Sequence, residues 1–183
     1  FSGVAQSFNY YPVSRMRPED GVATVALGLG KQVVEGGEAV RFSPRHPQIL
    51  PQFSSPAAVL EASQRSFWAL DLSRPVVDLS AGPGATLLRL PLERAEADGS
   101  LEVIGGVVSI PEDRVWDGVS RPGARVVTFG RILRGHAFPL CEVLEALLAM
   151  GRENLGFALE VEFAVNLDES GGGAETLRPL FRA

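Results

Sequence analysis

Apolar and polar residues alternate most regularly near the end of the chain, over residues 158–165. A strand in this segment places successive side chains on opposite faces, so Glu160, Glu162 and Ala164 share one face. The other face carries Leu159, Val161, Phe163 and Val165. The pattern predicts a strand with one buried apolar face and two carboxylates about 7 Å apart on the other.

A helical period begins after Pro139. Its apolar residues recur at spacings of three and four and predict an amphipathic helix that ends at Gly151. These apolar residues are Leu140, Val143, Leu144, Leu147 and Leu148. A shorter helix is predicted from Ser55 to about Ser66, because Ser is a favoured N-cap and Pro56 fits the first helical position.

Short apolar runs predict the remaining strands. They cover residues 1–8, 22–27, 38–42, 67–71, 86–94, 101–110, 124–129 and 174–182. Asp98-Gly99 is typical of a hairpin between residues 86–94 and 101–110, and residues 112–123 look like a polar loop.

Hairpin signals outnumber strand–helix–strand units, which favours an α+β fold. We expect an antiparallel-rich mixed sheet covered by a few helices. That single sheet should hold the strands near residues 1–8, 22–27, 86–94, 101–110, 124–129 and 158–165. The helix after Pro139 should cover one of its faces.

Composition limits the classes of protein. The 183 residues suffice for one domain, residues 1–183, and the predicted strand at Phe1 suggests a piece of a longer protein. With 17 basic and 22 acidic residues, the net charge of −5 argues against a nucleic-acid surface. A polyphosphate ligand would therefore need a metal ion or locally placed cations.

The predicted location is cytoplasmic. One cysteine, Cys141, cannot form an internal disulfide, and no long apolar stretch predicts a membrane span. Cys141 falls in the first turn of the helix after Pro139, where a thiol pKa can fall. Because no partner histidine follows a known pattern, a buried inert thiol is the expectation. His46 and His136 lack metal-ligand spacing and are expected at the surface or in packing.

Two features could carry chemistry. Gly28-Leu-Gly30-Lys31 matches neither the P-loop nor the dinucleotide fingerprint. It is either a turn between strands or a backbone approach to a phosphate, with Lys31 as a point charge. Glu160 and Glu162 form either a solvated outer face or a Mg²⁺ site, since Mg²⁺ often binds one or two carboxylates plus phosphates.

Three segments in this order resemble the nucleotide-binding domain of the phosphoenolpyruvate synthase / pyruvate phosphate dikinase family, an ATP-grasp. They are Phe1-Ser-Gly-Val-Ala, the run from Asp20 through Gly28-Leu-Gly-Lys-Gln-Val-Val-Glu-Gly, and Leu159-Glu-Val-Glu-Phe-Ala-Val. In the family the corresponding motifs read Ser-Gly-Val-x-Phe-Thr, Gly-Leu-Gly-Glu-x-Val-Val-x-Gly and acidic-x-Glu-[Phe/Trp]. The likeness spans most of the chain, and the order and spacing of the motifs give it weight.

The resemblance implies that the chain is the carboxyl half of an ATP-grasp domain, with a first lobe before Phe1. Glu160 and Glu162 would hold Mg²⁺ against the phosphates of the substrate ATP. Gly28, Gly30 and Lys31 would contact the nucleotide. Arg178 matches a family arginine that contacts the terminal phosphate.

The activity implied is Mg-dependent phosphoryl transfer from ATP toward a relay histidine on another domain and then to pyruvate. The implied partners are ATP and other domains of the same parent chain. Neither His46 nor His136 would be the relay. The isolated chain, clamping ATP from one side, is expected to be inactive and to bind Mg-ATP weakly or undetectably.

Two departures from the family leave alternatives open. Lys31 stands where the family has Glu, and Thr176 where it has a metal-binding Gln. The chain could instead be a degenerate ATP-grasp that serves as a nucleotide-responsive or protein-binding module. A third hypothesis is a structural α+β domain without a ligand.

Overall fold

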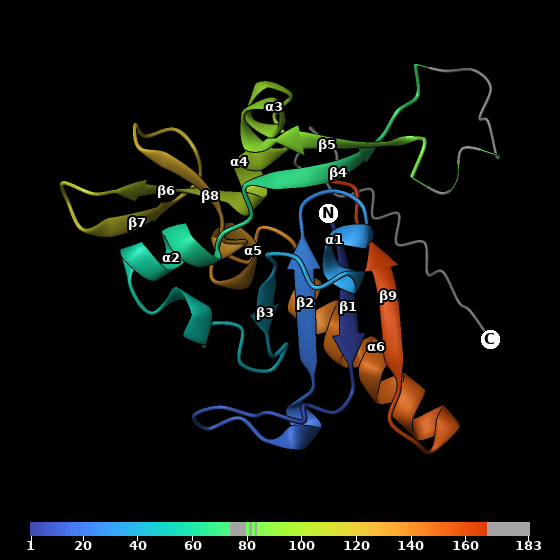
Figure 1. Ribbon diagram of the computed structural model, residues 1–183. Helices are drawn as coiled ribbons and strands as arrows, with labels where there is room; N and C mark the ends of the chain where they lie inside the picture. The colour runs from blue at the N-terminus through green and yellow to red at the C-terminus, as the bar shows by residue number, and fades with distance from the viewer. Residues whose placement is uncertain (74–79, 81, 83, 168–183) are drawn as a thin grey trace.

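The fold is α+β, with three antiparallel sheets and several helices around a main core (Figure 1). It was obtained as a computed structural model that describes residues 1–73, 80, 82 and 84–167. The strand predicted at residues 174–182 lies outside these residues. The fold class expected from the sequence is confirmed.

The main sheet has four strands in the order β3-β2-β1-β9. Every neighbouring pair is antiparallel. The strands are β1 (Ser2–Gln6), β2 (Val22–Ala26), β3 (Val40–Phe42) and β9 (Glu160–Ala164). β1 and β9 are neighbours despite more than 150 residues between them, so this sheet brings the two ends of the described chain together.

Two smaller sheets adjoin the main one. The first pairs β4 (Ser66–Leu70) with β5 (Leu87–Pro91). In the second, β6 (Gly105–Ser109) lies between β7 (Arg114–Asp117) and β8 (Ala124–Val127). The α-helices are α1 (Lys31–Val34), α2 (Pro56–Ala62), α3 (Leu92–Ala97), α4 (Leu101–Ile104), α5 (Gly130–Leu133) and α6 (Leu140–Leu155). Two short 3₁₀ turns, η1 (Pro18–Asp20) and η2 (Pro51–Phe53), complete the elements.

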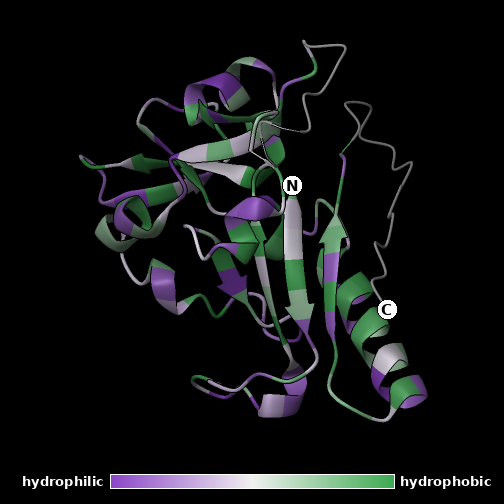
Figure 2. Ribbon diagram, turned by 45° about the vertical axis from the view of Figure 1, so that its right-hand side comes forward, coloured by the Kyte–Doolittle hydropathy of each residue, from purple (hydrophilic) through white to green (hydrophobic). Residues whose placement is uncertain are grey.

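The apolar stripe of α6 covers one face of the main sheet, as predicted. Leu140, Leu144 and Leu148 are buried in the core that also holds Val25 and Phe163. Figure 1 shows α6 behind β1 and β9, and Figure 2 shows hydrophobic residues along much of its length. This packing leaves the opposite face of the sheet for polar residues.

The helix from Pro139 continues past Gly151 and ends at Gly156, which takes a left-handed conformation with φ of +74°. The predicted end at Gly151 was wrong. An added Cβ at Gly151 would collide with the Leu159 side chain, so this glycine lets the chain after the helix pack closely against it. The helix after Ser55 begins as predicted, with Ser55 Oγ accepting from Ala58 N at 3.1 Å, but it ends early, at Ala62.

The predicted hairpin around Asp98-Gly99 was also wrong. Most of residues 92–104 form α3 and α4, and Gly99 (φ of +79°) lies in the turn between these helices. Leu92 and Ala95 are buried three residues apart, and the intervening residues are good helix formers. β5 therefore pairs with β4 and not with β6.

The strands expected to share one sheet are divided among three, which corrects the predicted topology. The segment at residues 112–123, predicted as loop, contains β7. Its Trp116 ring lies under two guanidinium groups, with Arg114 Cζ 4.3 Å and Arg121 Cζ 4.0 Å from the ring centroid. These contacts favour an extended strand despite the polar composition.

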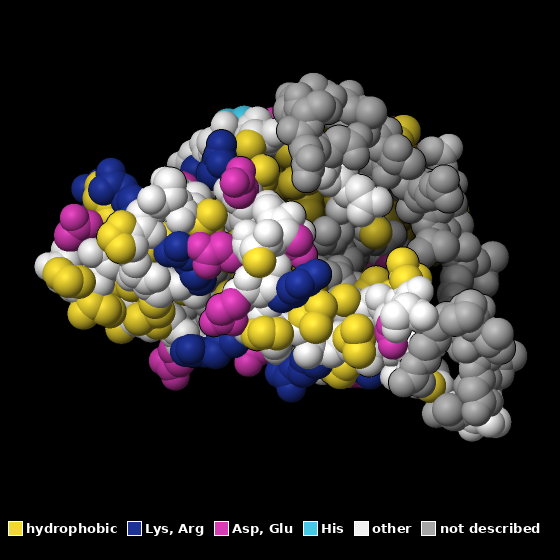
Figure 3. All heavy atoms as spheres, turned by 90° about the horizontal axis from the view of Figure 1, so that it is seen from above, with side chains coloured by type: hydrophobic (Ala, Val, Ile, Leu, Met, Phe, Trp, Pro, Cys, Tyr) yellow, Lys and Arg dark blue, Asp and Glu magenta, His cyan; other side chains and the backbone are white. Residues whose placement is uncertain are grey.

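The view from above shows the charge distribution on one face (Figure 3). Acidic and basic side chains are interspersed over its described part, and hydrophobic side chains gather toward the β6–β7 end. Ile110, in the turn that joins these strands, is 65% exposed. None of the helices in the described part of the chain is both long and apolar enough to cross a membrane.

Replacing Leu144 tests the packing of α6 on the main sheet. Leu144 is 1% exposed, so Leu144→Ala should leave a cavity and lower the free energy of unfolding by about 2–5 kcal/mol. The control is Leu155→Ala in the same helix, because Leu155 is 53% exposed and should change stability by less than about 0.5 kcal/mol. Equal effects in urea unfolding would contradict the packing.

Candidate functional site

The glycine loop, Gly28 to Lys31, follows β2 at the end of the main sheet nearest β4 (Figure 1). Gly28 has a φ of +91°, and Leu29 N donates to Trp68 O at 2.9 Å. A Cβ at Gly28 would lie 2.5 Å from Trp68 O. Glycine is therefore required at this position by both backbone conformation and the close approach of β4.

A buried amide fixes the start of this loop. Gln64 is 2% exposed, and its side chain accepts from Leu27 N and donates to Leu27 O, both at 2.9 Å. Its Nε2 also donates to Ser66 O at 2.9 Å. The start of the glycine loop and β4 are thus held together by hydrogen bonds from one side chain, and the two to Leu27 are buried.

Gly30 has no comparable structural requirement. Its backbone is in the right-handed helical region, with φ of −55° and ψ of −20°. An added Cβ would meet no atom within 4 Å. Because neither conformation nor packing demands glycine here, the absent side chain leaves open space beside the backbone.

The carboxylates of β9 lie on the face of the main sheet that α6 does not cover. Pairing places Glu160 opposite Gln6 and Glu162 opposite Val4 on β1. Figure 2 shows polar and apolar residues alternating along β9. Gln6 Nε2 donates to Glu160 Oε2, whereas the Glu162 carboxylate has no hydrogen bond or ion pair with any described residue.

One cleft lies between the glycine loop and the acidic strand β9. It encloses about 550 Å³ and is lined by Gly28, Gly30 and Glu162, among others. We call it the glycine-loop cleft. Its apolar lining includes Leu27, Leu29, Phe67 and Trp68. The structure therefore brings together residues separated by more than 130 positions in the sequence.

A second pocket, of about 280 Å³, adjoins this cleft across the same sheet face. Glu160, Thr24 and Arg41 line it, and Glu162 borders both spaces. Arg41 lies on β3 opposite Thr24, and its Nη2 donates to Asn9 Oδ1 at 2.9 Å. The face thus carries a guanidinium as well as two carboxylates.

Lys31 is not among the residues that line the glycine-loop cleft. Its Nζ lies 4.6 Å from the centroid of the Trp68 ring and 3.5 Å from Glu35 Oε1. The ammonium is thus engaged by a π face and a carboxylate beside the cleft. Arg178 and Thr176 lie outside the described residues.

The two glutamates fit a hard divalent cation such as Mg²⁺. In the described part of the chain, no three His, Cys, Asp or Glu side chains gather closely enough to hold a metal ion by themselves. A pair of carboxylates suits Mg²⁺, which commonly binds one or two carboxylates together with ligand phosphates. The donor set fits a metal that arrives with a polyphosphate.

The sequence interpretation missed several residues that build this site. Trp68 supplies a wall, Gln64 fixes the loop, and Arg41 adds a positive charge. Ser2 also lines the cleft. The adjacent aromatics Phe67 and Trp68 were a visible signal, but the roles of Gln64 and Arg41 depend on long-range pairing that sequence spacing does not reveal.

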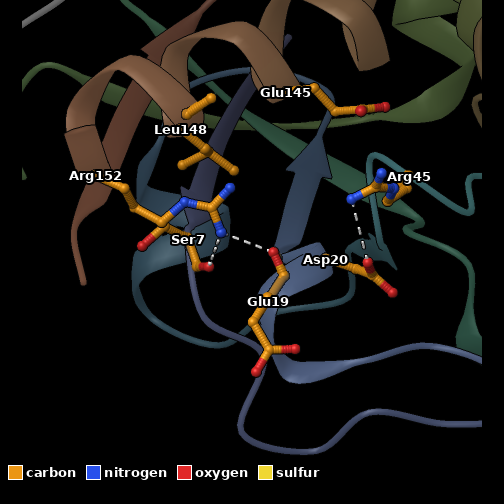
Figure 4. A pocket seen from close by; sticks show the side chains of 9 residues that line it. Ser7, Glu19, Asp20, Arg45, Glu145, Leu148 and Arg152 are labelled. Atoms are coloured by element: carbon orange, nitrogen blue, oxygen red, sulfur yellow. Dashed lines mark hydrogen bonds and ion pairs between the residues drawn. The ribbon is translucent and has the colours of Figure 1, made fainter. Parts of the chain in front are cut away.

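A smaller pocket, of about 150 Å³, lies near the other end of β1 (Figure 4). Arg152 Nη1 donates to Glu19 O at 2.7 Å and to Ser7 O at 3.3 Å. Arg45 Nη1 lies 3.7 Å from Asp20 Oδ1. These contacts join α6, η1 and the end of β1, so the charges here serve the fold.

Asp20 is the buried acid of this junction, with a side chain 7% exposed. Burial alone would raise its pKa. The hydrogen bond from Arg17 N, the contact with His46 at 3.1 Å and the charge of Arg45 outweigh burial and lower the pKa of Asp20. The ionised carboxylate is therefore favoured in the folded protein.

The remaining candidates have packing roles or surface contacts, as expected. His46 packs against Asp20, and exposed His136 has its Nδ1 3.5 Å from Glu142 Oε1. Cys141 is buried, and burial, with the nearby charges of Glu142 and Glu145, raises the pKa of its thiol to about 12. The expectation of a buried thiol is confirmed, and the raised pKa disfavours the reactive thiolate.

Comparison with known proteins adds no family assignment: no protein-family model, curated protein or solved structure matches the chain.

Alanine substitutions should distinguish Gly28, which the fold requires, from Gly30, which has open space beside it. Gly28→Ala should lower the free energy of unfolding by about 1–3 kcal/mol, because of its positive φ and the nearby Trp68 carbonyl. Gly30→Ala should leave stability unchanged or raise it by up to about 1 kcal/mol. Thermal and urea unfolding of both variants measure this difference, and a destabilised Gly30→Ala would contradict the geometry.

The lowered pKa of Asp20 predicts a pH-dependent stability difference. The folded pKa lies below the unfolded one, so the stabilisation is complete above the unfolded pKa and is lost as pH falls through the folded pKa. Asp20→Asn should be less stable by about 1–2 kcal/mol at neutral pH. This difference in stability between the unsubstituted protein and Asp20→Asn should disappear as the pH falls from about 5 to 2. The control Glu153→Gln removes an exposed carboxylate with no partner among the described residues, and a gap independent of pH would contradict the assignment.

Proposed function

We propose that this chain is the ATP-binding portion of a phosphotransferase resembling phosphoenolpyruvate synthase and pyruvate phosphate dikinase. The parent protein would transfer a phosphoryl group from Mg-ATP toward a histidine on another domain and then to pyruvate. One observation carries the proposal: Gly28, Gly30 and Glu162 line the same cleft. The glycine loop and the acidic strand lie more than 120 residues apart in the sequence and meet at this cleft.

The charges on the open sheet face support this use. A polyphosphate near a chain of net charge −5 needs positive charge close by. Glu160 and Glu162 would hold Mg²⁺, which would neutralise charge on the phosphates, and Arg41 contributes a cation on the same face. Phosphoryl transfer depends mainly on such neutralisation and on alignment, and less on a protein nucleophile.

The apolar end of the cleft supports a nucleoside rather than phosphate alone. Leu29, Phe67 and Trp68 line the space next to the glycine loop. Ligand sites are commonly lined by apolar and aromatic side chains with a few polar groups that fix orientation. A planar base fits this end, while the phosphates would extend toward Glu162 and Glu160.

The alternative is a nucleotide-responsive or protein-binding module without catalysis. The position of Lys31 favours it, because its ammonium contacts Trp68 and Glu35 and is not among the groups that line the cleft. Under this alternative the full-length protein binds Mg-ATP in the cleft without turnover. Turnover measured on the parent protein separates the two.

Titration with Mg-ATP, followed by NMR, tests binding by the 183-residue chain. We expect millimolar affinity, because one lobe encloses the ligand from one side. Amide shifts should concentrate at Gly28, Gly30 and Glu162 and should require Mg²⁺. Glu162→Gln should weaken the Mg²⁺-dependent binding about tenfold or more and leave the melting temperature unchanged or slightly higher.

Glu153→Gln is the matched control, since it removes an exposed carboxylate on α6 and should change neither binding nor stability. In the full-length parent, Glu162→Gln should lower ATP turnover by about 100-fold or more. Submicromolar binding to the isolated chain would refute the one-sided cleft. A lower melting temperature with unchanged turnover would show that Glu162 has a structural role.

A further inference from the structure

Ser2 carries a buried hydroxyl that the fold does not use. Its residue is 4% exposed. Among the described residues, Ser2 Oγ is the only buried side-chain nitrogen or oxygen without a hydrogen-bond partner. Buried polar groups are paired in nearly all native structures, so an unpaired hydroxyl calls for an explanation.

The position of Ser2 aims this hydroxyl at the ligand side of the sheet. Ser2 alternates with Gly3 along β1, so it shares a face with Val4, whose cross-strand neighbour is Glu162. Ser2 lines the glycine-loop cleft together with Gly28 and Gly30. Ser2, with its unpaired hydroxyl, and Glu162, with its unpartnered carboxylate, therefore border the same space.

The neighbours of Ser2 offer no replacement partner. Directly opposite it stand Ala26 on β2 and Ala164 on β9. Neither side chain has a hydrogen-bonding group, and a buried water needs two to four polar partners. Alanine at position 2 would suit such surroundings better, so the fold alone gives no reason for serine.

We infer that Ser2 Oγ hydrogen-bonds a polar group of the nucleoside, either a ribose hydroxyl or the edge of the base. This inference rests on the proposed function of the cleft. On this face of the sheet, every second pair of β1 and β9 contributes side chains: Gln6 with Glu160, Val4 with Glu162, and Ser2 with Ala164.

Each pair is about 7 Å from the next along the strands. If Glu160 and Glu162 mark the metal and phosphates, Ser2 lies one step further, toward the apolar walls. The hydroxyl thus distinguishes a nucleotide from a bare polyphosphate, making Ser2 a specificity residue.

The test compares Ser2→Ala with Ser7→Ala; Ser2 begins β1, and Ser7 directly follows its other end. Ser7 Oγ is a partnered hydroxyl, accepting from Leu159 N at 3.0 Å and lying in a residue 1% exposed. The readouts are melting temperature without ligand and NMR affinity for Mg-ATP and for Mg-tripolyphosphate.

Ser2→Ala should keep or raise the melting temperature, because it removes an unpaired buried hydroxyl. It should weaken Mg-ATP binding about two- to tenfold, the value of one hydrogen bond, and leave Mg-tripolyphosphate binding unchanged. Ser7→Ala should do the reverse, lowering the melting temperature and sparing both affinities.

Unchanged Mg-ATP affinity in Ser2→Ala would overturn the inference, as would equal losses for both ligands or a lower melting temperature. The proposed function fails separately. Absence of Mg-ATP binding to the full-length parent protein overturns both claims. A nucleotide affinity that depends on Ser2 but neither on Glu162 nor on Mg²⁺ keeps the nucleoside contact and rejects the metal site.

Discussion

The candidate site depends on β1 being paired along both edges. β2 and β9 flank this strand in antiparallel register, so Val4 stands between Thr24 and Glu162. A shift of one residue in either pairing would turn every side chain of the neighbour to the opposite face. This register fixes the relative positions of three features: β9, the glycine loop that follows β2, and the hydroxyl of Ser2.

One face of the main sheet packs against α6, and the other face is open. Packing on the covered face fixes which side chains of β9 point to the open face. An added Cβ at Gly3 would collide with the Phe163 ring and approach Thr24 O to 2.7 Å. The Phe163 ring therefore packs directly against the backbone of β1, on the side of the sheet that faces α6. With Phe163 held there, alternation directs the Glu162 side chain to the opposite side, where its carboxylate has no hydrogen bond or ion pair with a described residue.

Features that depend on local periodicity could be predicted from the sequence. The faces of β9 and the stripe of α6 follow from spacing alone, and both are confirmed. The division into three sheets could not be predicted, because the Gly99 turn suits two helices as well as a hairpin. The convergence of Ser2, Trp68 and Glu162 depends on pairing between distant segments, which no local pattern specifies.

The central claim, that the glycine loop and β9 form one metal-nucleotide cleft, is tested most directly by Mn²⁺ with ATP as a paramagnetic probe. Amide signals should broaden around Glu162 and Val4 and along residues 28–30, and only when both Mn²⁺ and ATP are present. Signals near Asp20 and Arg152, at the structural junction beyond the far end of β1, should stay sharp. Broadening centred on that junction, or none that requires ATP, would contradict the account.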